Sequence, residues 1–246
     1  MARVHGSNGR IYVAQYNLSG RANKLDLGME IDVPEVTAFE DVGKAFVAGR
    51  PGWDLSVEAF ADYVDDEIDE IIAAIGTSTV HVGAYFGGPA AGSVGYEGVG
   101  ALKSHARMSE NADAAKMKFD FMGAEGVFLG RACKLNEATV VTGTGAQTGL
   151  SFMAAATGAL VVFTSRVIAV TGAGSITMVL QESSDGGGDP YATAVTNTAQ
   201  TTMGSVRGTA VAGATLGPFW RTNVTAFSGF TDVTIRTSVA IVPPRA

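Results

Sequence analysis

The sequence predicts a mainly β protein. Thr, Val, Ala and Gly are common and Lys is rare, which favours strands over helices. Apolar segments of strand length are separated by Gly, Asp, Asn and Ser turns, and some alternate apolar and polar residues as a half-buried strand does. We expect a strand-rich N-terminal domain with one amphipathic helix, followed by a small C-terminal β-sandwich.

The distribution of charge predicts where the two domains divide. Residues 1–140 carry 12 basic and 20 acidic residues, whereas residues 141–246 carry 5 basic and 4 acidic residues. The stretch TGTGAQTG (Thr142–Gly149) contains small, flexible residues and is expected to be a linker. We therefore predict a first domain over 1–140 and a second domain over 141–246.

The first domain is expected to open with strands at Ile11–Ser19 and Asn23–Phe39, and Pro34 in the second of them marks an edge strand or a bend. The next segment, Trp53–Val64, alternates at its start: Trp53, Leu55, Val57 and Ala59 face one way, and Asp54, Ser56, Glu58 and Phe60 face the other. Four further strands are predicted at Ser78–Phe86, Tyr96–Met108, Ala114–Gly123 and Gly126–Leu135.

The period changes after Asp62, where a helix is predicted over about 62–76. Its apolar stripe has helical spacing and consists of Val64, Ile68, Ile71, Ile72 and Ile75. Gly76 is expected to end the helix.

The second domain is expected to be all β, with turns rich in Gly, Asp, Asn and Ser. Its predicted strands are Ala159–Gly172, Ser175–Ser184, Pro190–Asn197, Thr201–Val211, Phe219–Phe227 and Thr231–Val242. The loop Glu182–Pro190 groups acids with glycines and is interpreted as a hairpin turn in preference to a calcium site.

Carboxylates are concentrated in Gly52–Ile71, which contains eight of them and no Lys or Arg. On a regular helix such acids point toward solvent, so a solvated helix face is the first interpretation. A contact with a partner or a channel is the second, and a metal or catalytic site is the last. His5, His81 and His105 are isolated, and Cys133 is the single cysteine. We expect no catalytic residues, no metal site and no cofactor, and hence a protein that is not an enzyme.

Net charge and hydropathy limit the expected partners. A net charge of −7 is unsuited to a conventional nucleic-acid binder. The N-terminal MARVHGSNGR lacks an apolar run, and the most apolar stretch, GALVVFTSRVIAV, is interrupted by Arg166 and is shorter than a membrane span. We expect a chain made in the cytoplasm that does not contact a membrane.

Over residues 10–140 the order of elements resembles the major tail protein, or tail tube protein, of long-tailed bacteriophages. An early strand precedes a Thr-x-Phe segment with acids (Thr37–Asp41), a strand with Gly and aromatic residues (Gly49–Phe60), a helix, and the late segment KMKFDFMGAEGVFLG (Lys116–Gly130). The Thr- and Gly-rich second half is similar to the extra sandwich domains on the outer surface of many phage tail and capsid proteins. This similarity implies a surface-exposed accessory domain over 141–246.

The resemblance implies that the N-terminal domain is an antiparallel β-barrel or sandwich tube domain. It also implies a virion protein that forms hexameric rings stacked into a tube, with other tail proteins as partners and DNA passing through an acidic lumen without specific binding. Asp54 and Glu58 are candidates for lumen or ring contacts because they face away from Trp53. Loops such as Thr37–Pro51 and Phe86–Gly95 are candidate contacts between rings, and the first of them contains Glu40, Asp41, Lys44 and Arg50.

Three other functions remain open from the sequence. A capsid decoration or other virion surface protein would bind a preformed lattice. A carbohydrate-binding module would stack sugars on Trp220, Phe219 or Tyr191. A hydrolase is the third, although no G-x-S-x-G motif supports it.

Overall fold

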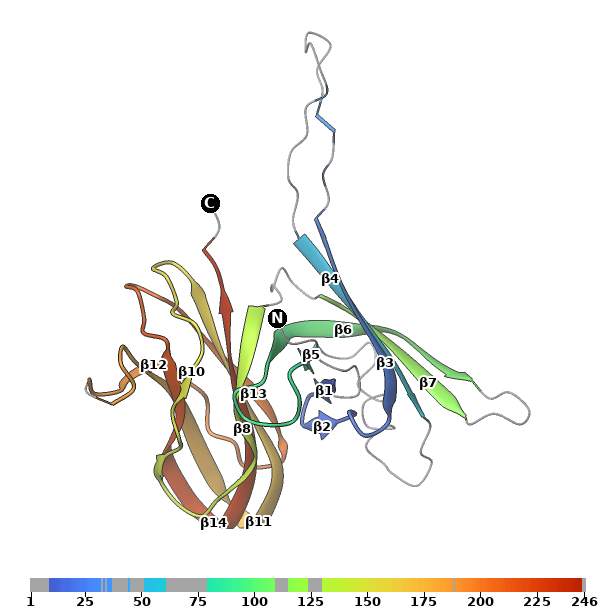
Figure 1. Ribbon diagram of the computed structural model, residues 1–246. Coiled ribbons are helices and arrows are strands. Elements are labelled where there is room, and N and C mark those ends of the chain that lie inside the picture. Colours follow the sequence, from blue (N-terminus) through green and yellow to red (C-terminus); the bar gives the residue numbers. More distant parts are fainter. Residues whose placement is uncertain are drawn as a thin grey trace. The chain divides into compact units, whose positions relative to one another are not determined.

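The computed structural model describes residues 9–31, 33, 35, 36, 44, 51–60, 79–108, 115–123, 130–187 and 189–244 (Figure 1). Its regular structure consists of strands, which confirms the mainly β fold class. The strands are β1 Arg10–Val13, β2 Tyr16–Asn17, β3 Ala22–Ile31, β4 Pro51–Phe60, β5 Val80–Tyr85, β6 Val94–Met108, β7 Lys116–Gly123, β8 Gly130–Val141, β9 Gly145–Ala146, β10 Leu150–Ser151, β11 Leu160–Ser183, β12 Ala192–Thr196, β13 Gly204–Val211 and β14 Phe219–Val242. The helix predicted over 62–76 lies outside the described residues.

The chain forms two compact units, each built from segments that are not contiguous in the sequence. Unit 1 comprises Met1–Ser19, His81–Glu97 and Gly130–Ala246, and unit 2 comprises Gly20–Val80 and Gly98–Leu129. This partition differs from the predicted division near 140–150, because β8, which ends at Val141, pairs with β14 of the second half and also with the start of β6. The segment expected to be a linker, Thr142–Gly149, lies within unit 1, where β9 pairs with β14 and the Gln147 amide donates to the Thr222 carbonyl at 2.8 Å.

A long antiparallel pair of strands, β11 with β14, forms the centre of unit 1. The pairing runs from Leu160 opposite Val242 to Ser183 opposite Phe219, with register shifts near Gly172. The two ends of the pair share one apolar core, in which Phe163 and Val239 of one end lie in the same cluster as Leu180 and Trp220 of the other. The pair of strands therefore folds back on itself, and the sandwich is built from its two halves.

The four strands predicted at Ala159–Gly172, Ser175–Ser184, Phe219–Phe227 and Thr231–Val242 are in fact two continuous strands. The backbone bends where the prediction placed breaks. A Cβ on Gly174 would overlap the Ser228 carbonyl oxygen, and Gly172 and Gly229 have φ of 93° and 76°. Glycines that were interpreted as turns instead let two bent strands approach closely.

The N-terminal strands belong to unit 1. β1 pairs with β5 and with the short β2, and β8 pairs with β14 and with the start of β6. The predicted single strand Ile11–Ser19 is a tight hairpin, because Ala14 adopts φ of 50° and the chain reverses. The predicted loop Glu182–Pro190 connects the antiparallel strands β11 and β12, as expected of a hairpin turn.

Unit 2 contains a four-stranded antiparallel sheet in the order β3-β4-β7-β6. The predicted alternation in β4 is confirmed: Trp53, Leu55, Val57 and Ala59 are at most 6% exposed. Met117, Phe119 and Phe121 of β7 are buried as well, and the register places Phe119 and Phe121 opposite Val57 and Leu55. One face of the sheet is therefore apolar and the other is polar.

Candidate functional site: a mixed-charge sheet face and a buried polar core

The polar face of the unit 2 sheet carries Asp54 and Glu58. Glu58 lies opposite Lys24 of β3 and Lys118 of β7. Each lysine also pairs with an acid on its own strand: Lys24 Nζ lies 2.7 Å from an Asp26 oxygen, and Lys118 Nζ lies 3.1 Å from an Asp120 oxygen. The acids of β4 therefore share their face with lysines from its neighbouring strands.

A groove of about 360 Å³ lies on this face beside Asp54. Gly28 makes room for the Asp54 carboxylate, because a Cβ at Gly28 would lie 2.5 Å from one of its oxygens. Glu30, Lys103 and Asp120 also line the groove, so its charges are of both signs. Among the described residues, no group of three or more His, Cys, Asp or Glu is placed to hold a metal ion.

Unit 1 contains a second notable arrangement, a polar core of five charged side chains and two tyrosines. Its members are Tyr12, Tyr85, Glu97, Lys134, Glu137, Arg166 and Arg236. They come from β1, β5, β6, β8, β11 and β14. The polar core thus joins strands that are far apart in the sequence.

The pair of Arg166 and Glu97 is the most deeply buried part of the polar core, with side chains 1% and 3% exposed. Arg166 Nη1 lies 2.9 Å from Glu97 Oε1, and Arg166 Nε donates to the Ala14 carbonyl at 2.8 Å. Tyr85 donates its hydroxyl to Glu97 Oε1 at 2.6 Å. Arg166 thereby ties the β1–β2 turn to the β11–β14 pair.

The second part of the polar core surrounds Glu137. Its two carboxylate oxygens accept from Tyr12 at 2.8 Å, from Lys134 at 3.2 Å and from Arg236 at 2.9 Å. Lys134 also donates to the carbonyls of Gly88 and Pro89, at 2.9 and 2.8 Å. The loop between β5 and β6, which the sequence suggested as a contact between rings, is thus anchored at its start to β8.

Burial and pairing shift the ionisation of these groups. Burial raises the pKa of Glu97, but the Arg166 charge and the Tyr85 hydrogen bond lower it by more, so the carboxylate stays ionised. Burial raises the pKa of Tyr12 and Tyr85, which keeps both phenols protonated. Because each ionised group faces a partner of opposite charge, the arrangement acts as a structural clamp.

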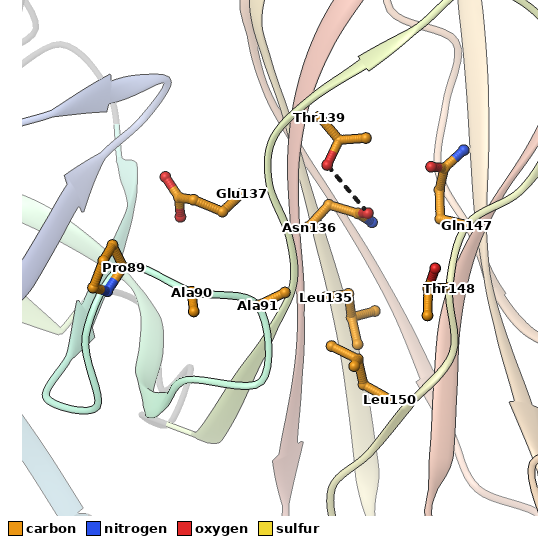
Figure 2. Close-up of a pocket in the computed structure, with 10 residues that line it drawn as sticks. All are labelled: Pro89, Ala90, Ala91, Leu135, Asn136, Glu137, Thr139, Gln147, Thr148 and Leu150. Atoms are coloured by element: carbon orange, nitrogen blue, oxygen red, sulfur yellow. Dashed lines mark hydrogen bonds between the residues drawn. The ribbon is translucent and has the colours of Figure 1, made fainter.

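A second groove, of about 570 Å³, opens beside the polar core in unit 1 (Figure 2). Glu137 lines it, but its carboxylate is already bound by Tyr12, Lys134 and Arg236. Thr139 donates to the Asn136 amide oxygen across the groove wall at 3.5 Å. The remaining lining is small and largely uncharged: Pro89, Ala90, Ala91, Leu135, Gln147, Thr148 and Leu150.

The predicted loop contacts are only partly within the described residues. Lys44 Nζ lies 2.9 Å from a Glu35 carboxylate oxygen at an exposed position. Glu40, Asp41 and Arg50 lie outside the described residues, as do the acids that follow Phe60 in the carboxylate-rich stretch.

His81 and Cys133 occupy ordinary sheet positions. His81 Nδ1 lies 2.8 Å from Ser205 Oγ, and burial together with the nearby Arg166 lowers its pKa to about 4. Cys133 is buried in β8, and burial raises its pKa to about 11. A neutral imidazole and a protonated thiol match the structural roles expected for them.

Trp220, one of the three aromatic residues suggested for stacking sugars, is wrong as such a candidate. Trp220 is fully buried in the sandwich core and donates its indole N–H to the Met153 carbonyl at 2.9 Å, so no sugar can stack on it. Tyr191 is covered on one face by the Arg221 guanidinium, 3.8 Å from the ring centre. An aromatic residue in a strand core supplies packing, and sequence cannot distinguish this from an exposed platform.

The polar core was not predicted from the sequence. One signal was present, because Arg166 interrupts the most apolar stretch of the chain, and a charge there must find a buried partner. Its partner Glu97 is 69 residues earlier in the sequence, and no local pattern links the two.

Within the described part of the chain, no helix is long and apolar enough to cross a membrane.

No protein-family model and no curated protein sequence matches the chain. Similar solved structures include a chain of the tail of an empty gene transfer agent particle with C6 symmetry, with 12% identity and a TM-score of 0.40 over 52% of this chain and 98% of that chain. The SPP1 Dit protein, described as a paradigm of the hub adsorption apparatus in phages that infect Gram-positive bacteria, has 8% identity and a TM-score of 0.36 over 95% and 98%. A chain of the phage P2 baseplate, in its activated conformation with Ca, has 6% identity and a TM-score of 0.34 over 97% and 98%. At these TM-scores no residue role is carried over to this chain.

Proposed function

We propose that this chain is a structural protein of a phage tail that assembles with copies of itself into rings. The sequence resemblance over residues 10–140 implies six copies in each ring and rings stacked into a tube that DNA crosses. The chain would then work by mechanical assembly, with other tail proteins as its further partners, and would carry out no reaction.

The observation that carries the proposal is the edge of the unit 2 sheet. β3 is ten residues long and, within the described part of the chain, pairs with β4 alone. A long unpaired edge presents backbone donors and acceptors that another strand can use, and proteins usually cover, pair or close such edges. A neighbouring copy that continues the sheet at β3 would satisfy them, and repetition around a ring would remove the edge.

The apolar face of the same sheet is incomplete at this edge. Leu55 and Val57 of β4 are at most 1% exposed, whereas Leu25 and Leu27 of β3 are half-buried and Met29 is 55% exposed. The register places these β3 residues on the same face as Trp53, Leu55 and Val57. The apolar stripe of β3 therefore has room for side chains from a neighbouring subunit.

The polar face of the sheet suits passage of DNA without binding. Two of its lysines are paired with acids at 2.7 and 3.1 Å, so these strands offer no uncompensated run of positive charge to phosphates. Asp54 and Glu58 would contribute to this surface if it lines the channel.

Met29→Arg tests the role of the β3 edge. In the single chain the side chain is mostly exposed, so the substitution should change the unfolding free energy by only about 0.5 kcal/mol. In the proposed ring it would bury an unpaired charge, at a cost of several kcal/mol (about tenfold in affinity for each 1.4 kcal/mol). We expect the wild-type chain to form rings or tubes in negative-stain images at high concentration and the variant to stay monomeric.

Val140→Arg is the matched control, because Val140 is 62% exposed and lies in unit 1 on β8. It should assemble like the wild type. A wild-type chain that stays monomeric at high concentration, or a Met29→Arg chain that assembles normally, would contradict the proposal.

A further inference from the structure

Arg207 of β13 is a half-buried cation without a matching anion. Its neighbour across the pairing is Thr164 of β11, and β13 pairs with no strand other than β11 within the described residues. The guanidinium makes no hydrogen bond or ion pair with any residue that the structure describes, although burial lowers its pKa. A partly desolvated charge with no partner costs free energy, which a bound carboxylate would offset.

The nearby acid is already in use. The carboxylate that acts electrostatically on Arg207 is that of Glu97, which is bound by Arg166 and Tyr85. Arg166 Nη2 is buried without a hydrogen-bond partner among the described residues, and His81 beside these arginines is neutral. The β13 side of the polar core therefore carries surplus positive charge.

The two units of the chain differ sharply in charge. Unit 1 contains nine basic and six acidic residues, a net charge of +3, whereas unit 2 contains eight basic and eighteen acidic residues, a net charge of −10. Asp54 and Glu30 of unit 2 are exposed carboxylates in a groove whose described lining includes a single lysine. Another copy of this chain therefore offers an acidic surface that complements the Arg207 region.

We propose that Arg207 docks a carboxylate of unit 2 from a second copy of this chain. The contact joins two different surfaces, unit 1 of one copy and unit 2 of the next, so it is head-to-tail and can propagate into a ring or a filament. It rests on the self-assembly proposed above and adds a specific anchor on unit 1.

Cross-linking can locate the partner. In Arg207→Lys the new amine occupies the same place, and a zero-length carbodiimide joins an amine to a carboxylate in contact with it. The variant is mixed as equal parts of ¹⁴N- and ¹⁵N-labelled chains, cross-linked and digested. We expect peptides that join the amine introduced at position 207 in a chain of one isotope to a unit 2 carboxylate in a chain of the other. Cross-links from this amine only within one chain, or none at all, would overturn the proposal.

A second measurement addresses the energy of the contact. Arg207→Glu should weaken self-association at least about tenfold by sedimentation, because it opposes two negative charges at a partly buried contact. Arg131→Glu is the control, since Arg131 is exposed on β8 and contacts Phe152. Equal association of Arg207→Glu and the control would refute the role of Arg207.

The results separate this proposal from the tail function. Wild-type oligomers that depend on Arg207 but form no rings or tubes would support the contact and contradict the tube. Rings that form equally well with Arg207→Glu would support the tube and contradict the contact.

Discussion

The buried pair of Glu97 and Arg166 allows a quantitative test of the polar core. Glu97→Gln keeps the shape of the side chain and an oxygen that can accept from Tyr85, but it removes the negative charge 2.9 Å from the Arg166 guanidinium. The two side chains are only 3% and 1% exposed, so water cannot replace the lost partner. We expect the free energy of unfolding to fall by about 3–5 kcal/mol at neutral pH.

The expected loss has a defined pH dependence. The pKa of Glu97 is lower in the folded protein than its ordinary value of 4.5, so its contribution is fully present above about pH 4.5 and is lost as the pH falls through the folded pKa. Protonated Glu97 resembles Gln, and the difference between wild type and variant should therefore shrink on acidification.

Urea denaturation followed by circular dichroism, at neutral and at acidic pH, measures both effects. The midpoint of thermal unfolding should fall by roughly 6–20 °C, since 1 kcal/mol corresponds to about 2–4 °C in a chain of this size. Glu58→Gln, on the half-exposed polar face of β4, should change stability by at most about 0.5 kcal/mol. A loss below about 1 kcal/mol for Glu97→Gln, or a loss that does not shrink in acid, would refute this account of the polar core.

Three further predictions concern buried positions. The His81 imidazole signal in NMR should stay at the neutral position down to about pH 5, since the pKa of His81 in the folded protein is about 4. The stability linked to His81 should be lost as the pH falls from 6.5, the ordinary pKa of histidine, toward 4, because in this range only the unfolded chain takes up the proton. The Cys133 thiol should react with Ellman's reagent only after denaturation, and fast reaction of the folded protein would contradict its burial. Gly95→Ala should lower stability by about 1–3 kcal/mol or more in urea titrations, because its Cβ would overlap the Ala84 carbonyl, and an unchanged midpoint would argue against this packing.

Local sequence patterns were sufficient to predict which side chains of a single strand are buried. The alternation from Trp53 to Ala59 correctly assigned four buried residues, because successive side chains of any strand point to opposite sides. Local patterns failed at glycines, because a glycine can either end a strand or bend a strand that continues. Gly172 and Gly174 have the composition of a turn, yet the backbone passes through them as one strand of 24 residues.

The charges around β4 also could not be predicted from the sequence of that strand alone. Along the sequence, no Lys or Arg lies between Pro51 and Leu102, which suggested a surface of one sign. Across the sheet, Glu58 lies between Lys24 and Lys118. The residues that compensate a charge in a sheet lie on neighbouring strands, about 4.7–4.9 Å away. The sequence of one strand does not show which residues these are.

The sequence by itself determined the mainly β class, the two-faced strand at Trp53–Ala59, the structural character of His81 and Cys133, and the acidic balance of the chain. These follow from composition and from the period of two, both of which are local. The tertiary structure alone decided which distant strands share a unit, that Trp220 is buried, and that Glu97, Glu137 and their three cations meet in one polar core. The physical reason is that burial and charge pairing depend on contacts between residues far apart in the chain, and only the folded sheet brings those residues together.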